Sequence, residues 1–177
     1  YMDFKFTNEY PISRLDEIVS FLLGPRLWIS QTDYPDFLDW AEKSYKELKK
    51  ENKRAVLALA GNDIVGVSIY QRHKKLADTL EIKNLTVRPD HRGRYIASFL
   101  MRNTEIEGAS DFNSQYVICD AKARNLAIRF FLHKHQYKIC SRDDLYGLNA
   151  GKDIIYKKQL TSWDRIHSRY LTLAETG

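Results

Sequence analysis

The sequence has few cysteines and no long apolar run. Only two cysteines, Cys119 and Cys140, occur in 177 residues, and neither lies in a CxxC pair or a Cys/His cluster. This count argues against a disulfide framework, and the spacing argues against a zinc site, so we expect a reducing, cytoplasmic environment and no metal. No window approaches the roughly 18 consecutive apolar residues of a membrane-spanning helix, so we expect no membrane partner.

Acidic residues are outnumbered by basic ones. The chain has 28 lysines and arginines against 23 aspartates and glutamates, a net charge of +5. A basic surface favours polyanions, which include nucleic acids and phosphate-rich small molecules. Much of the excess comes from one lysine-rich run, residues 43–54, which also suits a solvated helix face. No nucleic-acid recognition element accompanies the charge, so we do not expect nucleic acid as the partner.

The most informative stretch is residues 80–101, LEIKNLTVRPDHRGRYIASFLM. Its first part alternates as a strand, but Leu80 and Ile82 are in one phase and Leu85 and Val87 in the other. One extra residue near 83–84 would bring all four side chains to one face, as a β-bulge does. The sequence therefore predicts a bulged strand that ends before Pro89.

A short basic loop follows this strand and precedes a helical pattern. Residues 92–97 offer backbone N–H groups at a helix start, and Arg92 and Arg94 supply two guanidinium groups beside them. Amides and a helix dipole aimed at one point favour an anion such as a pyrophosphate. An ordinary basic connector between a strand and a helix has the same composition, and the loop alone does not separate the two interpretations.

The rest of the chain alternates between strand and helix patterns. Strands are predicted at 3–7, 55–60, 64–71, 115–121, 137–141 and 153–160, and helices at 11–23, 35–48, 96–103 and 125–136. No domain boundary is visible before about residue 161, so residues 1–160 read as one domain of ordinary size. Residues 161–177 read as a C-terminal helical extension with an apolar side. We favour packing of that side on the same domain over a homodimer interface or a missing part of the protein.

These features resemble the GNAT superfamily of N-acyltransferases. The family's acyl-CoA loop runs Gln/Arg-x-x-Gly-x-Gly/Ala, with Arg92 in the first position here and Ala97 in the last. Tyr95 stands where the family usually has glycine, which lets the chain approach the pyrophosphate closely. A second motif is similar over residues 122–137, where its places are filled by Asn125, Ala127-Ile128, Phe130-Phe131 and Gln136-Tyr137.

The resemblance implies a fold and a set of ligand-binding residues. The fold is a GNAT-like α/β fold, a mixed central sheet of about six to seven strands flanked by about four helices and splayed after the bulged fourth strand. The acyl donor is acetyl-CoA, and the residues implied in binding it are Leu85, Thr86, Val87, Arg92, Gly93, Arg94, Tyr95, Ile96, Ala97, Ser98, Asn125 and Phe131.

The same resemblance suggests how the chemistry is divided among side chains. Glu81 stands where several members have a catalytic glutamate, although a surface strand carboxylate would look the same. Trp28 and Tyr34 lie where the family covers the acceptor amine. The family's acidic tyrosine falls on Phe131 or Leu132, and neither carries a hydroxyl.

Three hypotheses follow for the function. The first is an N-acetyltransferase that moves an acetyl group from acetyl-CoA to a primary amine of a small molecule or protein by direct attack. The second is a non-catalytic acyl-CoA-binding sensor or scaffold, favoured by the missing glycine at Tyr95 and by the missing tyrosine. The third is an RNA-directed acetyltransferase, which rests on the basic charge alone.

Overall fold

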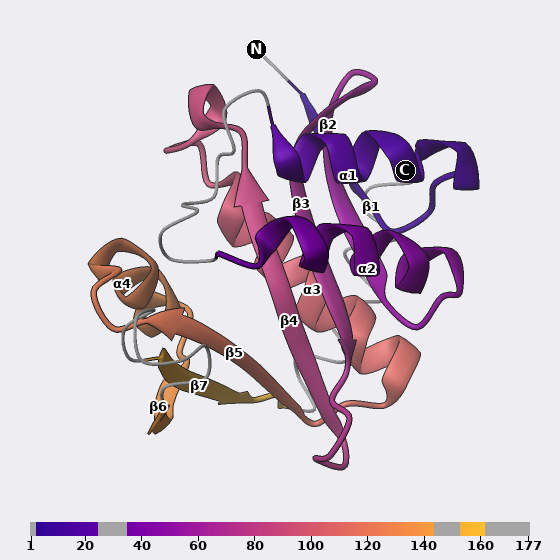
Figure 1. Ribbon diagram of the computed structural model, residues 1–177. Coiled ribbons are helices and arrows are strands. Elements are labelled where there is room, and N and C mark those ends of the chain that lie inside the picture. The colour runs from indigo at the N-terminus through magenta and orange to yellow at the C-terminus, as the bar shows by residue number, and fades with distance from the viewer. Residues whose placement is uncertain (1–2, 25–34, 144–152, 162–177) are drawn as a thin grey trace.

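Seven strands form one mixed sheet in the order β1-β2-β3-β4-β5-β7-β6 (Figure 1). The computed structural model describes residues 3–24, 35–143 and 153–161. The strands are β1 (Phe4–Thr7), β2 (Arg54–Ala60), β3 (Asp63–Arg72), β4 (Thr79–Val87), β5 (Tyr116–Lys122), β6 (Lys138–Asp143) and β7 (Asp153–Gln159). The helices are α1 (Leu15–Leu23), α2 (Phe37–Lys49), α3 (Ile96–Phe112) and α4 (Leu126–Lys134), with short 3₁₀ turns η1 (Ile12–Arg14) and η2 (Pro89–His91).

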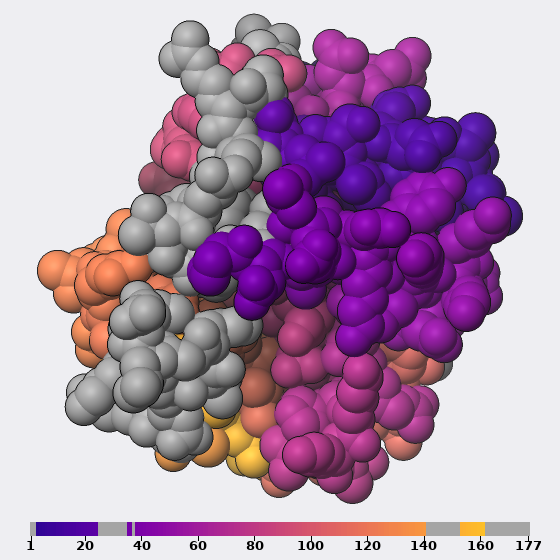
Figure 2. All heavy atoms as spheres, in the orientation of Figure 1, coloured from indigo at the N-terminus to yellow at the C-terminus, as the bar shows by residue number. Residues whose placement is uncertain are grey.

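Helices cover both faces of the sheet because its central strands are apolar on both sides. On β3, Tyr70 belongs to one hydrophobic core and the adjacent Ile69 to the other, as the alternation of a strand requires. The first core includes Leu100 of α3, and the second includes Ile18 of α1. Figures 1 and 2 show α1 and α2 side by side on the near face, and Figure 1 shows α3 behind the sheet.

The bulge predicted in β4 is present. Ile82 pairs with Tyr70 and Asn84 with Ile69, which leaves Lys83 as the extra residue. The extra residue restores the phase of the strand, so its apolar side chains all reach the core beneath α3, as the sequence pattern predicts. They are Leu80, Ile82, Leu85 and Val87.

β4 and β5 diverge after a short parallel contact. The contact consists of Thr79 with Tyr116, Leu80 with Val117 and Glu81 with Ile118. From there β5 pairs with β7 along its whole length, and β4 pairs with β3 up to Val87. The two strands visibly separate in Figure 1. This splayed, mixed sheet with helices on both faces confirms the fold predicted from the resemblance.

Two expectations from the sequence concern residues that the structure does not describe. They are the predicted C-terminal helix from about residue 162 and the acceptor-binding residues Trp28 and Tyr34. Within residues 3–24, 35–143 and 153–161, no helix is long and apolar enough to cross a membrane.

Candidate functional site

The loop between β4 and α3 turns through two left-handed residues. Gly93 has a φ of 79° and Tyr95 a φ of 63°. Tyr95 is the N-cap of α3, and its carbonyl accepts a hydrogen bond from the amide of Phe99 at 3.1 Å. A left-handed conformation costs an L-residue roughly 1–2 kcal/mol, whereas glycine adopts it freely. The geometry therefore explains why glycine suits position 95 and shows that tyrosine is held there under strain.

The start of α3 is suited to an anion. No side chain caps this helix, and the first amides of a helix have no partner within it. These amides belong to Ile96, Ala97 and Ser98, and the helix dipole adds a partial positive charge at the same point. Arg92 and Arg94 are exposed beside them. Nε of Arg92 donates to the carbonyl of Val87 at 3.1 Å, which fixes the loop to the end of β4.

Residues of α4 approach this loop from the far side of the divergence. Oγ of Ser98 lies 2.9 Å from Nε2 of His135, so α3 is connected to the end of α4. The ring of Phe131 lies 4.5 Å from the ring of His135. At the other end of α4, Oδ1 of Asn125 accepts from the amide of Ile128 at 3.2 Å and caps the helix. Ser98 and Phe131 are thus brought together, while Asn125 lies at the opposite end of α4.

His135 is a residue of this region that the motifs did not indicate. Burial lowers its pKa below the ordinary value for histidine, and the charges of Lys158 and Lys134 lower it further. Ser98 and His135 are distant in sequence and lie on different elements, so no spacing rule predicts their contact. The spacing of Phe131 and His135 was the one available signal in the sequence, because residues four apart meet on a helix.

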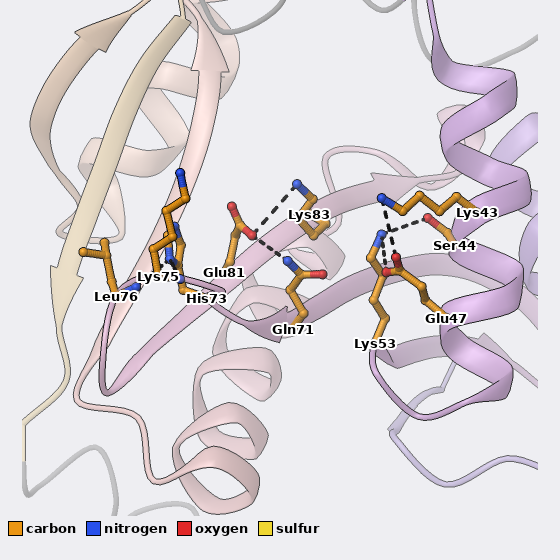
Figure 3. Close-up of polar contacts among 10 residues, drawn as sticks. All are labelled: Lys43, Ser44, Glu47, Lys53, Gln71, His73, Lys75, Leu76, Glu81 and Lys83. Carbon is orange, nitrogen blue, oxygen red and sulfur yellow. Dashed lines mark hydrogen bonds and ion pairs between the residues drawn. The ribbon is translucent and has the colours of Figure 1, made fainter.

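Glu81 occupies the last position at which β4 and β5 are paired. Its neighbours Leu80 and Ile82 point into the core beneath α3, so Glu81 points to the opposite face, where α1 and α2 lie. Nε2 of Gln71 donates to Oε1 of Glu81 at 2.8 Å, and Nζ of Lys83 lies 3.9 Å from the same oxygen (Figure 3). The Glu81 side chain is 21% exposed, so the carboxylate is oriented but still accessible.

The structure places no hydroxyl at the position of the family's acidic tyrosine. Leu132 is buried, and Phe131 is half-buried. The hydroxyl of Tyr137 lies 3.4 Å from Oε2 of Glu105, and burial raises the pKa of this tyrosine well above its ordinary value. Cys119 is buried in β5, and burial raises the pKa of its thiol as well, which disfavours the reactive thiolate.

A separate hollow lies between α1 and α2, with a volume of about 310 Å³. It is lined by Asp16, Val19, Ser20, Leu23, Leu38, Ala41, Glu42 and Tyr45. All of these residues belong to the two helices, so the hollow does not include the loop before α3 or the diverging strands. The arrangement of Glu81, the loop and α4 therefore defines the candidate site, and the hollow does not.

Comparisons with known proteins agree with this geometry. The model of the acetyltransferase (GNAT) family matches residues 16–136. A GNAT-family protein from Desulfovibrio desulfuricans has the same fold with a TM-score of 0.70 and 13% identity, over 91% of this chain and 100% of that chain. An N-acetyltransferase from Staphylococcus aureus gives 0.69 and 14%, over 90% and 99%.

A Bacillus anthracis protein solved in complex with acetyl coenzyme A gives a TM-score of 0.55 and 18% identity, over 62% of this chain and 63% of that chain. At such identities these likenesses show the fold alone. No curated protein matches the chain. The family model, in contrast, spans more than half of the sequence and includes the bulged strand, the loop before α3 and α4, and on this ground the chain belongs to the acetyltransferase (GNAT) family.

Proposed function

We propose that the protein transfers an acetyl group from acetyl-CoA to the primary amine of a small molecule or a protein. The observation that carries this proposal is the position of Glu81. This accessible carboxylate stands where β4 leaves β5, on the strand that leads to the uncapped start of α3. One end of this strand segment carries an oriented carboxylate, and the other end leads to an anion site. This arrangement suits a long donor with a thioester at one end and phosphates at the other.

The loop and the beginning of α3 would hold the diphosphate of the donor. The amides of residues 93–98 supply hydrogen-bond donors, and Arg92 and Arg94 supply positive charge. Asn125 and Phe131 of α4 would contact the pantetheine arm from the other side. Leu85 and Val87 would offer their backbone groups on β4, although Nε of Arg92 already donates to the carbonyl of Val87. The bond from the amide of Arg88 to the carbonyl of Val65 sets the ladder so that the backbone groups of Thr86 face β3.

Glu81 would act as the general base. A protonated amine cannot attack, and a carboxylate can remove its proton directly or through one water molecule. The amine nitrogen then forms a bond to the carbonyl carbon, and the carbon–sulfur bond breaks. The departing thiolate takes a proton from water, because α4 (Leu126–Lys134) has no hydroxyl side chain to donate one. A free thiol has a pKa of about 8.5, so departure without a protein acid is feasible near neutral pH.

Release of free CoA thiol from acetyl-CoA tests the proposal. With a panel of primary amines, we expect thiol release above the rate of hydrolysis, and a large loss of this activity in Glu81→Gln. Titration calorimetry with CoA in the same experiment separates binding from chemistry. Absence of binding would overturn the proposal.

A second candidate is an acyl-CoA-binding protein without turnover. The strained Tyr95 and the missing hydroxyl on α4 are the observations that favour it. It predicts tight binding of CoA together with no thiol release for any amine of the panel, and the same two measurements therefore distinguish the candidates.

A further inference from the structure

The surroundings of Glu81 carry more positive than negative charge. Figure 3 shows the side chains that gather beside it on the face that α1 and α2 cover. Gln71 and Lys83 come from β3 and β4. On one side of them lie residues of α2 and of the turn that follows it, Lys43, Ser44, Glu47 and Lys53. On the other side of Glu81 lie residues of the connection between β3 and β4, His73, Lys75 and Leu76.

Lys53 is fully engaged by its neighbours. It is 4% exposed, and its Nζ lies 3.2 Å from Oε2 of Glu47 and 3.3 Å from Oγ of Ser44. Nζ of Lys43 lies 3.7 Å from the other oxygen of Glu47. The single carboxylate of Glu47 therefore pairs with two ammonium groups, those of Lys53 and Lys43, so these three side chains together carry a net positive charge.

The charges of the cluster act on one another. Burial lowers the pKa of Lys53 most strongly, and its contact with Glu47 opposes this effect. The charges of Lys83 and Lys43 lower the pKa further, so the fields of all three lysines overlap at this place. Burial alone would raise the pKa of Glu47, but Lys53, Lys43 and Lys74 together hold it below its ordinary value.

Lys83 is the lysine of this group that is best placed to meet a ligand. It is the extra residue of the β4 bulge, which turns its side chain toward Glu81. Its side chain is 27% exposed, and its Nζ is 3.9 Å from Oε1 of Glu81, too far for a good hydrogen bond. Oε1 already accepts from Gln71 at 2.8 Å. An ammonium group that is partly buried and only loosely paired attracts a further anion.

The net charge around Glu81 indicates which acceptors the site favours. The positive charges are Lys43, Lys53 and Lys83, the negative ones are Glu47 and Glu81 itself, and Lys74 adds a further positive charge. This field disfavours a polycation and assists the release of a proton from an incoming ammonium group. An acceptor that carries its own negative charge would be attracted by the same field.

We propose that the acceptor is a primary amine that also carries a carboxylate or a phosphate, and that Lys83 binds this anionic group. The proposal rests on the acetyl transfer proposed above and adds the chemical class of the acceptor. It makes Lys83 a specificity-determining residue, while the proton of the amine goes to Glu81.

A matched series of amines tests this inference. The series consists of 4-aminobutanoate, its neutral amide and 1,4-diaminobutane, which share one carbon chain and differ in the charge of the far group. A further acceptor, 3-aminopropyl phosphate, shows whether the site prefers a phosphate or a carboxylate as the anionic group. We expect kcat/KM to be higher for an anionic acceptor than for the neutral amide by about tenfold, and lowest for the diamine. The preference should weaken as salt is added.

Variants of Lys83 test whether this residue causes the preference for anionic acceptors. Lys83→Gln should raise the KM for the anionic acceptor about tenfold and affect the KM for the neutral amide far less, because only the anion loses a charged partner. Lys83→Arg should keep the preference. Lys138→Gln, which removes one exposed lysine from β6, is the matched control and should behave as the unmodified protein.

The outcomes separate the two proposals. Binding of CoA and turnover of the neutral amide, with no preference for the anion or no effect of Lys83→Gln, would overturn the inference and leave acetyl transfer standing. Absence of both CoA binding and thiol release with every amine would overturn both. Thermal unfolding of each variant, followed by circular dichroism, shows whether a loss of activity is a loss of fold.

Discussion

The side-chain amide of Gln71 holds the carboxylate of Glu81 across two neighbouring strands. The two residues are direct partners in the register of β3 and β4, and Nε2 of Gln71 lies 2.8 Å from Oε1 of Glu81. One carboxylate oxygen is therefore fixed. The other has no donor drawn to it in Figure 3 and is the better candidate to receive a proton.

Glu81→Gln should lower kcat by about 100-fold or more, because a positioned general base contributes that much. Affinity for CoA should be unchanged, since the loop before α3 is untouched. The measurement is steady-state thiol release together with calorimetry. Glu42→Gln, a change of one exposed carboxylate on α2, is the control. An unaltered kcat in Glu81→Gln would exclude this carboxylate as the base.

Tyr95→Gly should increase the free energy of unfolding by about 1 kcal/mol, because glycine adopts the left-handed conformation without the steric cost of a side chain. The Tyr95 residue is 69% exposed, and Nζ of Lys134 lies 5.6 Å from the centre of its ring, so little packing is lost. Urea unfolding measures the change.

The same variant should bind CoA more tightly, since the backbone of the loop becomes accessible. Tyr95→Phe keeps the strain and should resemble the unmodified protein in stability. A less stable Tyr95→Gly would mean that the contacts of the ring outweigh the strain.

Lys122 and Asp153 form an ion pair inside the protein, where β5 ends and β7 begins. Their side chains are 1% and 0% exposed, and Nζ lies 3.1 Å from Oδ1. Asp153→Asn should lower the free energy of unfolding by about 3–5 kcal/mol, because it removes the negative charge that lies beside a buried ammonium group. The double variant Lys122→Met, Asp153→Leu should recover most of that loss in urea unfolding. A small effect of Asp153→Asn would show that other contacts of Lys122 compensate.

Acid should destabilise the protein partly through His135. Its pKa is lowered in the folded state, so below about pH 6.5 the unfolded chain binds the proton more readily. The contribution of His135 to stability is therefore complete above about pH 6.5 and is lost as the pH falls toward the folded pKa. The stability difference between the unmodified protein and His135→Gln should shrink between pH 7.5 and 5.5. A constant difference would contradict a lowered pKa.

The local features of the site followed from local patterns in the sequence. The change of phase between Ile82 and Leu85 required an extra residue, and Lys83 is that residue. Tyr95 stands at a glycine position of the loop motif, which we interpret through close approach to the pyrophosphate; its φ of 63° adds a second reason for glycine there. These features depend on neighbours along the chain, so the sequence specifies them directly.

Contacts between distant segments were not predictable from the same patterns. Ser98 meets His135 because α3 and α4 are placed together by the sheet, and nothing near either residue encodes the other. The pairing of Lys122 with Asp153 likewise depends on β5 and β7 being neighbours. The divergence of β4 from β5 was expected only through the resemblance to a known family.

The short parallel contact between β4 and β5 joins strands β1 to β4 to strands β5, β7 and β6. Behind it lies Gly108 of α3, where an added Cβ would come within 2.3 Å of Cδ2 of Leu80. Any larger side chain at position 108 would press on Leu80, which pairs with Val117 in this contact. The separation of β4 from β5 therefore depends on a residue of α3 that belongs neither to the loop before α3 nor to the surroundings of Glu81.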